Sequence, residues 1–215
     1  MAVAATTELE AINIMLAAIG EAPVSSLTGL LPQDVAIAQS TLVETNRAVQ
    51  SEGWSFNTEI DVTLTRNGTN EIDIPVDVLR VDANIHQHPT IDPIQRELKL
   101  YDRLNNTYTF EEDLICTVVY FREYKEIPEP ARRYINIRSA RIFVDRLVSD
   151  DGLRTYTQQD EIRARAVLME TDLNNGEHNL LRGDPSLTNV FSTFSPANGL
   201  IRYLWELYQE LYLLY

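Results

Sequence analysis

The chain of 215 residues is predicted to be an α+β protein: a four-helix bundle with an inserted antiparallel β lobe, a small sandwich or curled sheet, and a C-terminal arm. Apolar residues recur at helical spacing near both ends and alternate at strand spacing between them. A polar stretch then precedes a final segment rich in leucine and tyrosine. We expect a helical domain from 1–53 and 123–183, a β lobe at 54–122 and an arm at 184–215.

The first two helices are expected at 7–19 and 34–51. Thr7 and Glu10 have the spacing of a capping box, in which each side chain bonds the other residue's backbone N–H. Asp34 is a suitable N-cap for the second helix. The apolar side of that helix is predicted to contain Ala38, Leu42, Thr45 and Val49.

The sequence period changes at Gly53, from helical spacing to the alternation of a strand. We expect Gly53 to end the helix with a positive φ, which glycine adopts at low cost. Trp54 begins the alternation and is predicted to lie in the core, with one face of its strand buried and the other in water. Six strands are expected, at 54–64, 71–74, 79–83, 98–101, 107–110 and 114–122.

Two further helices are expected at 130–149 and 158–174. On the second of these, Glu161 and Arg165 have the spacing to pair on the exposed side. Its apolar stripe requires a packing partner, which the other helices would supply. The members of that stripe are Ile162, Ala166, Met169 and Leu173.

Charge and composition restrict the classes of function. The net charge of −14 argues against a nucleic-acid-binding surface, which needs cations to neutralise phosphates. It is compatible with simple solubility, or with a conduit along which DNA slides without adhering. No apolar run is long enough for a membrane span, and residues 1–19 lack the positive start of a secretory signal. The single cysteine, Cys116, is expected to be a buried, inert thiol.

No pattern in the sequence identifies an enzyme. His86 and His88 could hold zinc together with Asp92, but no supporting ligands are marked, and a solvated loop edge is the expected state. The acidic runs 111–113 and 150–151 contain paired carboxylates, the minimum for glycoside hydrolysis. Both runs fall between expected elements, where acidic residues ordinarily face water. We therefore expect no catalytic residue, no metal and no cofactor.

Three stretches give the chain a specific resemblance. They are a helix that stops at an Ile-Gly-Glu-Ala-Pro-Val turn within 9–24, the helix–Gly–Trp–strand junction at 50–57, and Phe-Arg-Glu-Tyr-Lys-Glu-Ile-Pro-Glu at 121–129. Their sequences, order and separations resemble the tail tubular protein A family of short-tailed bacteriophages (podoviruses). The resemblance extends over about residues 7 to 183.

This resemblance implies a structural virion protein rather than an enzyme. Such proteins form a ring, usually of about twelve subunits, between the portal protein and the nozzle made by tail tubular protein B. Tail fibres attach around the joint, and DNA passes through the channel as non-specific cargo. Two alternatives from other classes remain: a cell-wall or polysaccharide hydrolase of the tail, and a soluble host-modulating binding protein.

The C-terminal segment is the predicted portal-docking arm. Tyrosine and tryptophan bury much area while keeping a polar group, and they are favoured at interfaces. Packing of this segment on its own bundle is the alternative, whereas its acidic polar side argues against a membrane surface. The docking candidates are Leu200, Tyr203, Leu204, Trp205, Leu207, Tyr208, Leu211 and Tyr212.

Overall fold

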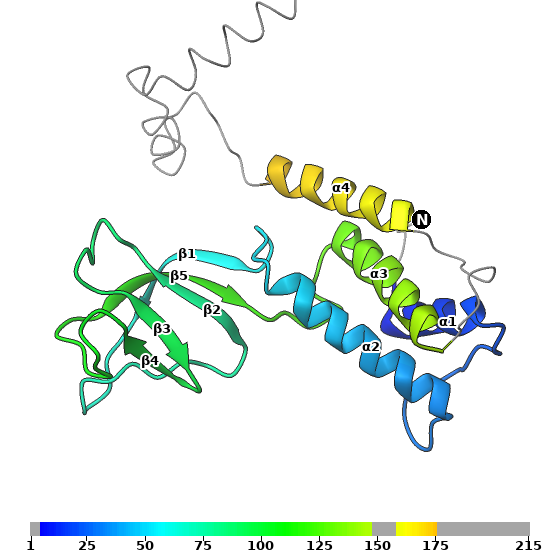
Figure 1. Cartoon of the computed structure of the whole chain (residues 1–215), viewed down its shortest axis with the longest axis horizontal. Helices are drawn as coiled ribbons and strands as arrows, with labels where there is room; N and C mark the ends of the chain where they lie inside the picture. The colour runs from blue at the N-terminus through cyan, green and yellow to red at the C-terminus, as the bar shows by residue number, and fades with distance from the viewer. Residues whose placement is uncertain (1–4, 148–157, 176–215) are drawn as a thin grey trace, which may run out of the picture. The chain divides into compact units, whose positions relative to one another are not determined.

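The computed structural model describes residues 5–147 and 158–175, which belong to one compact unit. The α+β class is confirmed: helices occur at both ends of the described chain, and antiparallel strands lie between them (Figure 1). In chain order the elements are α1 (Glu8–Ala18), α2 (Gln33–Gln50), β1 (Thr58–Leu64), β2 (Val78–Ala83), β3 (Pro93–Arg96), β4 (Lys99–Asp102), β5 (Leu114–Tyr120), α3 (Glu129–Leu147) and α4 (Gln158–Asn175).

The start of α1 has the predicted capping box. The Glu10 backbone N–H donates to Thr7 Oγ1 at 3.2 Å, and the Thr7 N–H donates to Glu10 Oε2 at 2.7 Å. These bonds from Thr7 hold the pKa of Glu10 below its ordinary value. The N-cap predicted for α2 was wrong: Pro32 occupies it, and Asp34 lies in the first turn. There its charge still favours the positive end of the helix dipole.

The helices share one hydrophobic core, with α3 packed against the other three. Each predicted apolar residue of α2 is buried. Helices α1, α2 and α3 supply most of the core, and α4 contributes Ala164 and Leu168. Trp54 is also a member, so the residue that follows Gly53 joins the helical core and not the β lobe.

The β lobe has two small antiparallel sheets and a separate core. One sheet has the order β1-β5-β2, and the other pairs β3 with β4. Because β5 is central, each of its residues is buried or half-buried, on both faces of the sheet. The core of this lobe consists of Ile72, Ile74, Val78, Val81, Leu100, Phe110, Leu114, Cys116 and Val118.

Two of the six predicted strands were wrong. The segments 71–74 and 107–110 make isolated bridges only, which include Glu71 to Thr109 and Asp102 to Thr107. Strand β3 was missed because its first residue is the proline of an Asp-Pro turn signal. A proline at the first position of a strand is tolerated because no ladder hydrogen bond is lost.

The helix–strand junction agrees with the prediction only at its first residues. Gly53 has φ +81°, and a Cβ there would lie 2.7 Å from Arg80 Nη2. Trp54 is buried as expected. Strand β1 begins four residues later, at Thr58, and a bulge with Asp61 at φ +57° interrupts its pairing with β5. The predicted buried face is therefore lost, and Ile60 is 74% exposed.

Candidate interaction surface

Two amide side chains, those of Asn57 and Gln50, join the helices to the β lobe by hydrogen bonds. Asn57, fully buried, donates to the carbonyl oxygens of Gln50 and Tyr120 at 2.9 and 2.8 Å, and its own oxygen accepts from the Trp54 N–H. Gln50 donates to the Arg122 carbonyl at 2.9 Å and accepts the Arg122 N–H at 2.8 Å. The segment that leads from α2 to β1 and the segment that leads from β5 to α3 are thus hydrogen-bonded to each other.

Polar side chains also bind the backbone in the other two stretches that carried the resemblance. Asn13 donates to the carbonyl of Val24 at 3.0 Å and accepts its N–H at 2.8 Å, which closes the turn after α1. Arg132 donates to the carbonyls of Ile127, Lys125 and Thr6. Sequence periodicity missed these roles, because it treats a polar residue as one that faces water.

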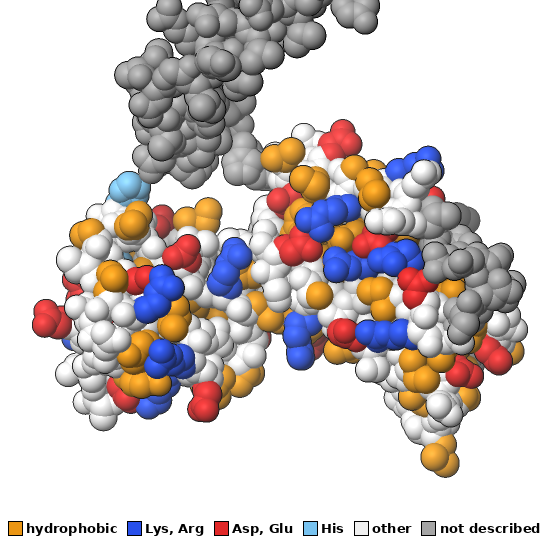
Figure 2. Space-filling model, in the orientation of Figure 1, with side chains coloured by type: hydrophobic (Ala, Val, Ile, Leu, Met, Phe, Trp, Pro, Cys, Tyr) orange, Lys and Arg blue, Asp and Glu red, His pale blue; other side chains and the backbone are white. Residues whose placement is uncertain are grey.

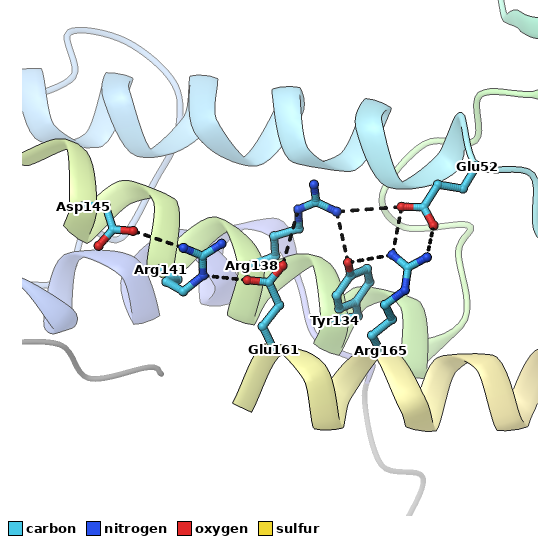
Figure 3. A network of polar contacts seen from close by, with 7 residues as sticks. All are labelled: Glu52, Tyr134, Arg138, Arg141, Asp145, Glu161 and Arg165. Atoms are coloured by element: carbon cyan, nitrogen blue, oxygen red, sulfur yellow. Dashed lines mark hydrogen bonds and ion pairs between the residues drawn. The ribbon is translucent and has the colours of Figure 1, made fainter. Parts of the chain in front are cut away.

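A network of arginines and carboxylates attaches α4 to α3 and to the end of α2 (Figure 3). Arg165 binds Glu52 at 2.6 Å, and the Tyr134 hydroxyl accepts from Arg165 and Arg138 at 3.2 and 3.0 Å. These contacts with Glu52 and Tyr134 raise the pKa of Arg165. Glu161 binds Arg141 at 2.6 Å. The predicted pairing of Glu161 with Arg165 is wrong, since each binds another part of the chain.

The apolar stripe of α4 faces outward, contrary to the prediction. We call Ile162, Ala166, Met169 and Leu173 the α4 ridge. Its three large side chains are 60%, 48% and 62% exposed, in chain order, whereas Ala164 and Leu168 are buried against the core. Figure 2 shows hydrophobic side chains gathered over this helix. A sustained apolar row on a firmly attached helix is typical of an interaction site.

The histidine pair lacks the geometry of a metal site. His88 is buried, its Nε2 accepts the Ile115 N–H at 2.9 Å, and its Nδ1 is 2.8 Å from Glu112 Oε1. Because the Ile115 N–H must be the donor, the hydrogen lies on Nδ1 and is donated to Glu112. Both ring nitrogens are therefore occupied, and the predicted solvated loop edge is wrong for His88. Among the described residues no group of three or more potential ligands is close enough for a metal.

Two of the carboxylates considered for hydrolysis, Glu112 and Asp113, have structural partners. Glu112 holds His88, and Asp113 accepts from the backbone and side chain of Arg66 at 3.0 and 3.2 Å. Those bonds hold the pKa of Asp113 below its ordinary value, the opposite of what a general acid needs. The other acidic pair, 150–151, lies outside the described residues.

Cys116 is buried at the centre of the β lobe. Burial raises the pKa of its thiol from 9.0 to about 11, with a smaller contribution from Asp82. The thiol therefore stays protonated in the native protein near pH 8. As the pH rises past 9.0, the unfolded chain loses this proton first, so ionisation favours unfolding.

We expect the native protein to resist a thiol reagent such as dithiobis(nitrobenzoate) at pH 8. In denaturant the same sample should release one equivalent of the coloured product, from the single cysteine. Native labelling at the rate of a free thiol would contradict burial of Cys116, because only the thiolate of an accessible cysteine reacts.

The predicted portal-docking residues 200–212 lie outside the residues that the structure describes. Within the described ranges, no helix is both long and apolar enough to cross a membrane. Among the described residues, the α4 ridge is an exposed apolar surface available for interaction.

Comparison with known proteins identifies the family. The family model for tail tubular proteins matches residues 9–178, which include, apart from Glu8, the helices and both sheets of the described chain. The chain belongs to the tail tubular protein family. A tail tubular protein is a structural component of a bacteriophage tail, and this protein is therefore a virion tail component. No curated protein matches the chain.

The family match contains all three stretches that carried the resemblance. In this tail tubular protein each of them is a place where buried or half-buried polar side chains bind the backbone. The described chain has an outward apolar helix face, and Glu112 and Asp113 are engaged in structural contacts.

Proposed function

We propose that this tail tubular protein is a subunit of the adaptor ring that joins the portal to the tail nozzle and lets DNA pass. The observation that carries the proposal is the family match over most of the described chain. Its partners would be the portal protein, tail tubular protein B of the nozzle, tail fibres, and other copies of itself in a ring of about twelve.

The outward apolar ridge of α4 supports an assembling protein. Surface helices ordinarily bury their apolar side and expose their charges, whereas α4 pairs Arg165 and Glu161 with Glu52 and Arg141 and exposes isoleucine, methionine and leucine. Such a surface is costly in an isolated monomer and is stabilised when another protein removes it from water. A subunit that works only within a larger assembly has this property.

The acidic balance suits the proposed conduit. A net charge of −14 on each subunit would give the ring a strongly negative field. DNA phosphates are repelled by such a surface, so the strand would pass without the phosphate contacts that hold a DNA-binding protein in place. The charge would therefore serve passage rather than capture.

The C-terminal segment 184–215 is proposed to dock to the portal through its leucine and aromatic side chains. An amphipathic helix captured in a groove buries an apolar row spaced at three and four residues. Leu200, Leu204, Leu207 and Leu211 have this spacing, and Trp205 is the proposed anchor.

Size-exclusion chromatography with light scattering tests the proposal directly. The purified protein, alone and mixed with its portal protein, is expected to give a portal complex whose mass corresponds to a ring of added subunits. A monomer in the absence of portal is compatible with assembly on the portal. Failure to bind the portal across the accessible concentration range would contradict the adaptor function.

A further inference from the structure

The α4 ridge is presented on a rigid support. On one side of the helix, Arg165 and Glu161 bind Glu52 and Arg141, and Asp172 accepts the Ser55 N–H at 2.7 Å. These bonds fix both the position and the rotation of α4 about its axis. The ridge is therefore a preformed surface, which loses little conformational freedom when it binds.

A second apolar surface lies where α1 begins, beside α2 and the segment before α3. We call it the α2 hollow; its volume is about 370 Å³. Leu42, Val43, Phe121 and Tyr124 supply its apolar part, and Val43 is 44% exposed. Five charged residues also line it: Glu123 and Lys125, which pair with each other at 2.6 Å, the buried Arg132, and Glu8 and Arg47. The Arg47 guanidinium lies 6.0 Å from the centre of the Phe121 ring.

The ridge and the hollow face in different directions. Arg132 of α3 lines the hollow, whereas Arg141 of α3 binds α4. Arg141 follows Arg132 by nine residues, about two and a half helical turns, so the two side chains leave opposite sides of α3. Figures 1 and 3 agree with this, since α3 lies between α2 and α4 in both views. The two surfaces of one subunit therefore cannot meet each other.

The charges beside the two surfaces are complementary. Glu170 is exposed beside the ridge, and Arg47 is exposed at the hollow. Arg163, also beside the ridge and 3.7 Å from Asp160, is opposite in sign to Glu8 of the hollow. Glu170 and Arg163 beside the apolar ridge thus have counterparts of opposite sign in Arg47 and Glu8 at the apolar hollow.

We propose that the α4 ridge of one subunit docks into the α2 hollow of a second copy of this chain. Because one surface meets a different surface on the next copy, the contact is heterologous and repeats from subunit to subunit. A heterologous contact closes into a ring when the rotation between copies allows it. The inference rests on the proposed ring and names the surfaces that form it.

Engineered cysteines test this pairing, since the native Cys116 is buried and does not interfere. The full-length samples to be oxidised are the variants Val43→Cys and Met169→Cys, each alone, a mixture of the two, and a chain that has both substitutions. Each sample is tested free at high concentration and bound to portal. The mixture is expected to give disulfide-linked dimers, and the doubly substituted chain a ladder of higher multimers. Neither single variant should cross-link to itself. Ile60→Cys, exposed in the β lobe, replaces Val43→Cys in the matched control and should give no ladder.

Charge reversal supplies a second, independent measurement. Arg47→Glu and Glu170→Arg are each expected to weaken subunit association about tenfold by placing like charges together. The chain with both substitutions should recover association, because every contact then again joins opposite charges. Recovery distinguishes a direct pair from a general loss of stability. Two single variants that assemble like the parent, or a double variant that stays as weak as the singles, would overturn the proposal.

The remaining outcomes separate this inference from the proposed function. If the doubly substituted chain forms rings on the portal but gives no ladder of disulfide-linked multimers, the ridge-and-hollow contact is overturned. The proposed adaptor function is unaffected by that result. Self-cross-linking of Met169→Cys alone would show ridge-to-ridge pairing and would also overturn it. If deletion of 176–215 makes the Met169→Cys monomer strongly more reactive to maleimide, the chain's own C-terminal segment covers the ridge, which overturns it as well. No self-association and no portal binding would refute both.

Discussion

Replacing Trp54 by alanine is expected to lower the free energy of unfolding by about 3–5 kcal/mol, the usual cost of truncating a large buried aromatic residue. The side chain is only 6% exposed and belongs to the core shared by the four helices. Its indole N–H donates to the Val49 carbonyl at 2.8 Å, and the Arg165 guanidinium lies 5.9 Å from its ring. Truncation would leave a cavity at the meeting point of α2, α3 and α4.

Urea denaturation followed by circular dichroism measures this effect. Trp54→Phe is the matched control: it keeps much of the buried area and loses the bond to Val49, so we expect a smaller loss of about 1–2 kcal/mol. If the melting temperature of Trp54→Ala falls within a degree of the parent, the side chain is not part of the core and the junction as described is wrong.

Deletion of residues 184–215 is expected to abolish association with the portal while leaving the melting temperature nearly unchanged. Among the described residues the two hydrophobic cores extend along the chain as far as Leu168, and we expect these cores to form without the deleted segment. Docking would need it, because the proposed apolar anchors all lie within it. Differential scanning calorimetry and portal binding are the two measurements.

A single substitution tests which side chain of the deleted segment binds the portal. Trp205→Ala should weaken portal binding by at least about thirtyfold, which corresponds to roughly 2 kcal/mol for a buried interfacial tryptophan. Tyr215→Ala, at the chain end and outside the proposed anchors, is the control and should bind like the parent. If the truncated protein unfolds, the segment is part of the protein's own core. If the truncated protein still binds the portal normally, the docking site lies elsewhere in the chain.

The helices were predictable because their signals are local. The bounds of α1, α3 and α4 lie within two residues of the expected ones over the described chain, and the capping box at Thr7 formed as its spacing indicated. Gly53 has the positive φ expected where a helix ends. Each of these features depends on residues within one or two helical turns, so a single sequence contains the information.

The β lobe was less predictable because its pairing depends on distant residues. The alternation after Trp54 is present in the sequence, but Asn57 is held by Gln50 and Tyr120, which delays the start of β1. Segments 71–74 and 107–110 have strand-like patterns, yet they bridge only at single residues. Whether such a segment becomes a strand is decided by which backbone groups lie opposite it.

The sequence by itself determined the helix positions, the sharp change at Gly53, the inert character of Cys116 and the resemblance that the family match then confirmed. Only the tertiary structure decided which side of α4 is buried. Periodicity shows that a helix has an apolar side, but the ion pairs to Glu52 and Arg141 turn that side outward. Such bonds join residues 113 and 20 positions apart, so no local pattern in the sequence records them.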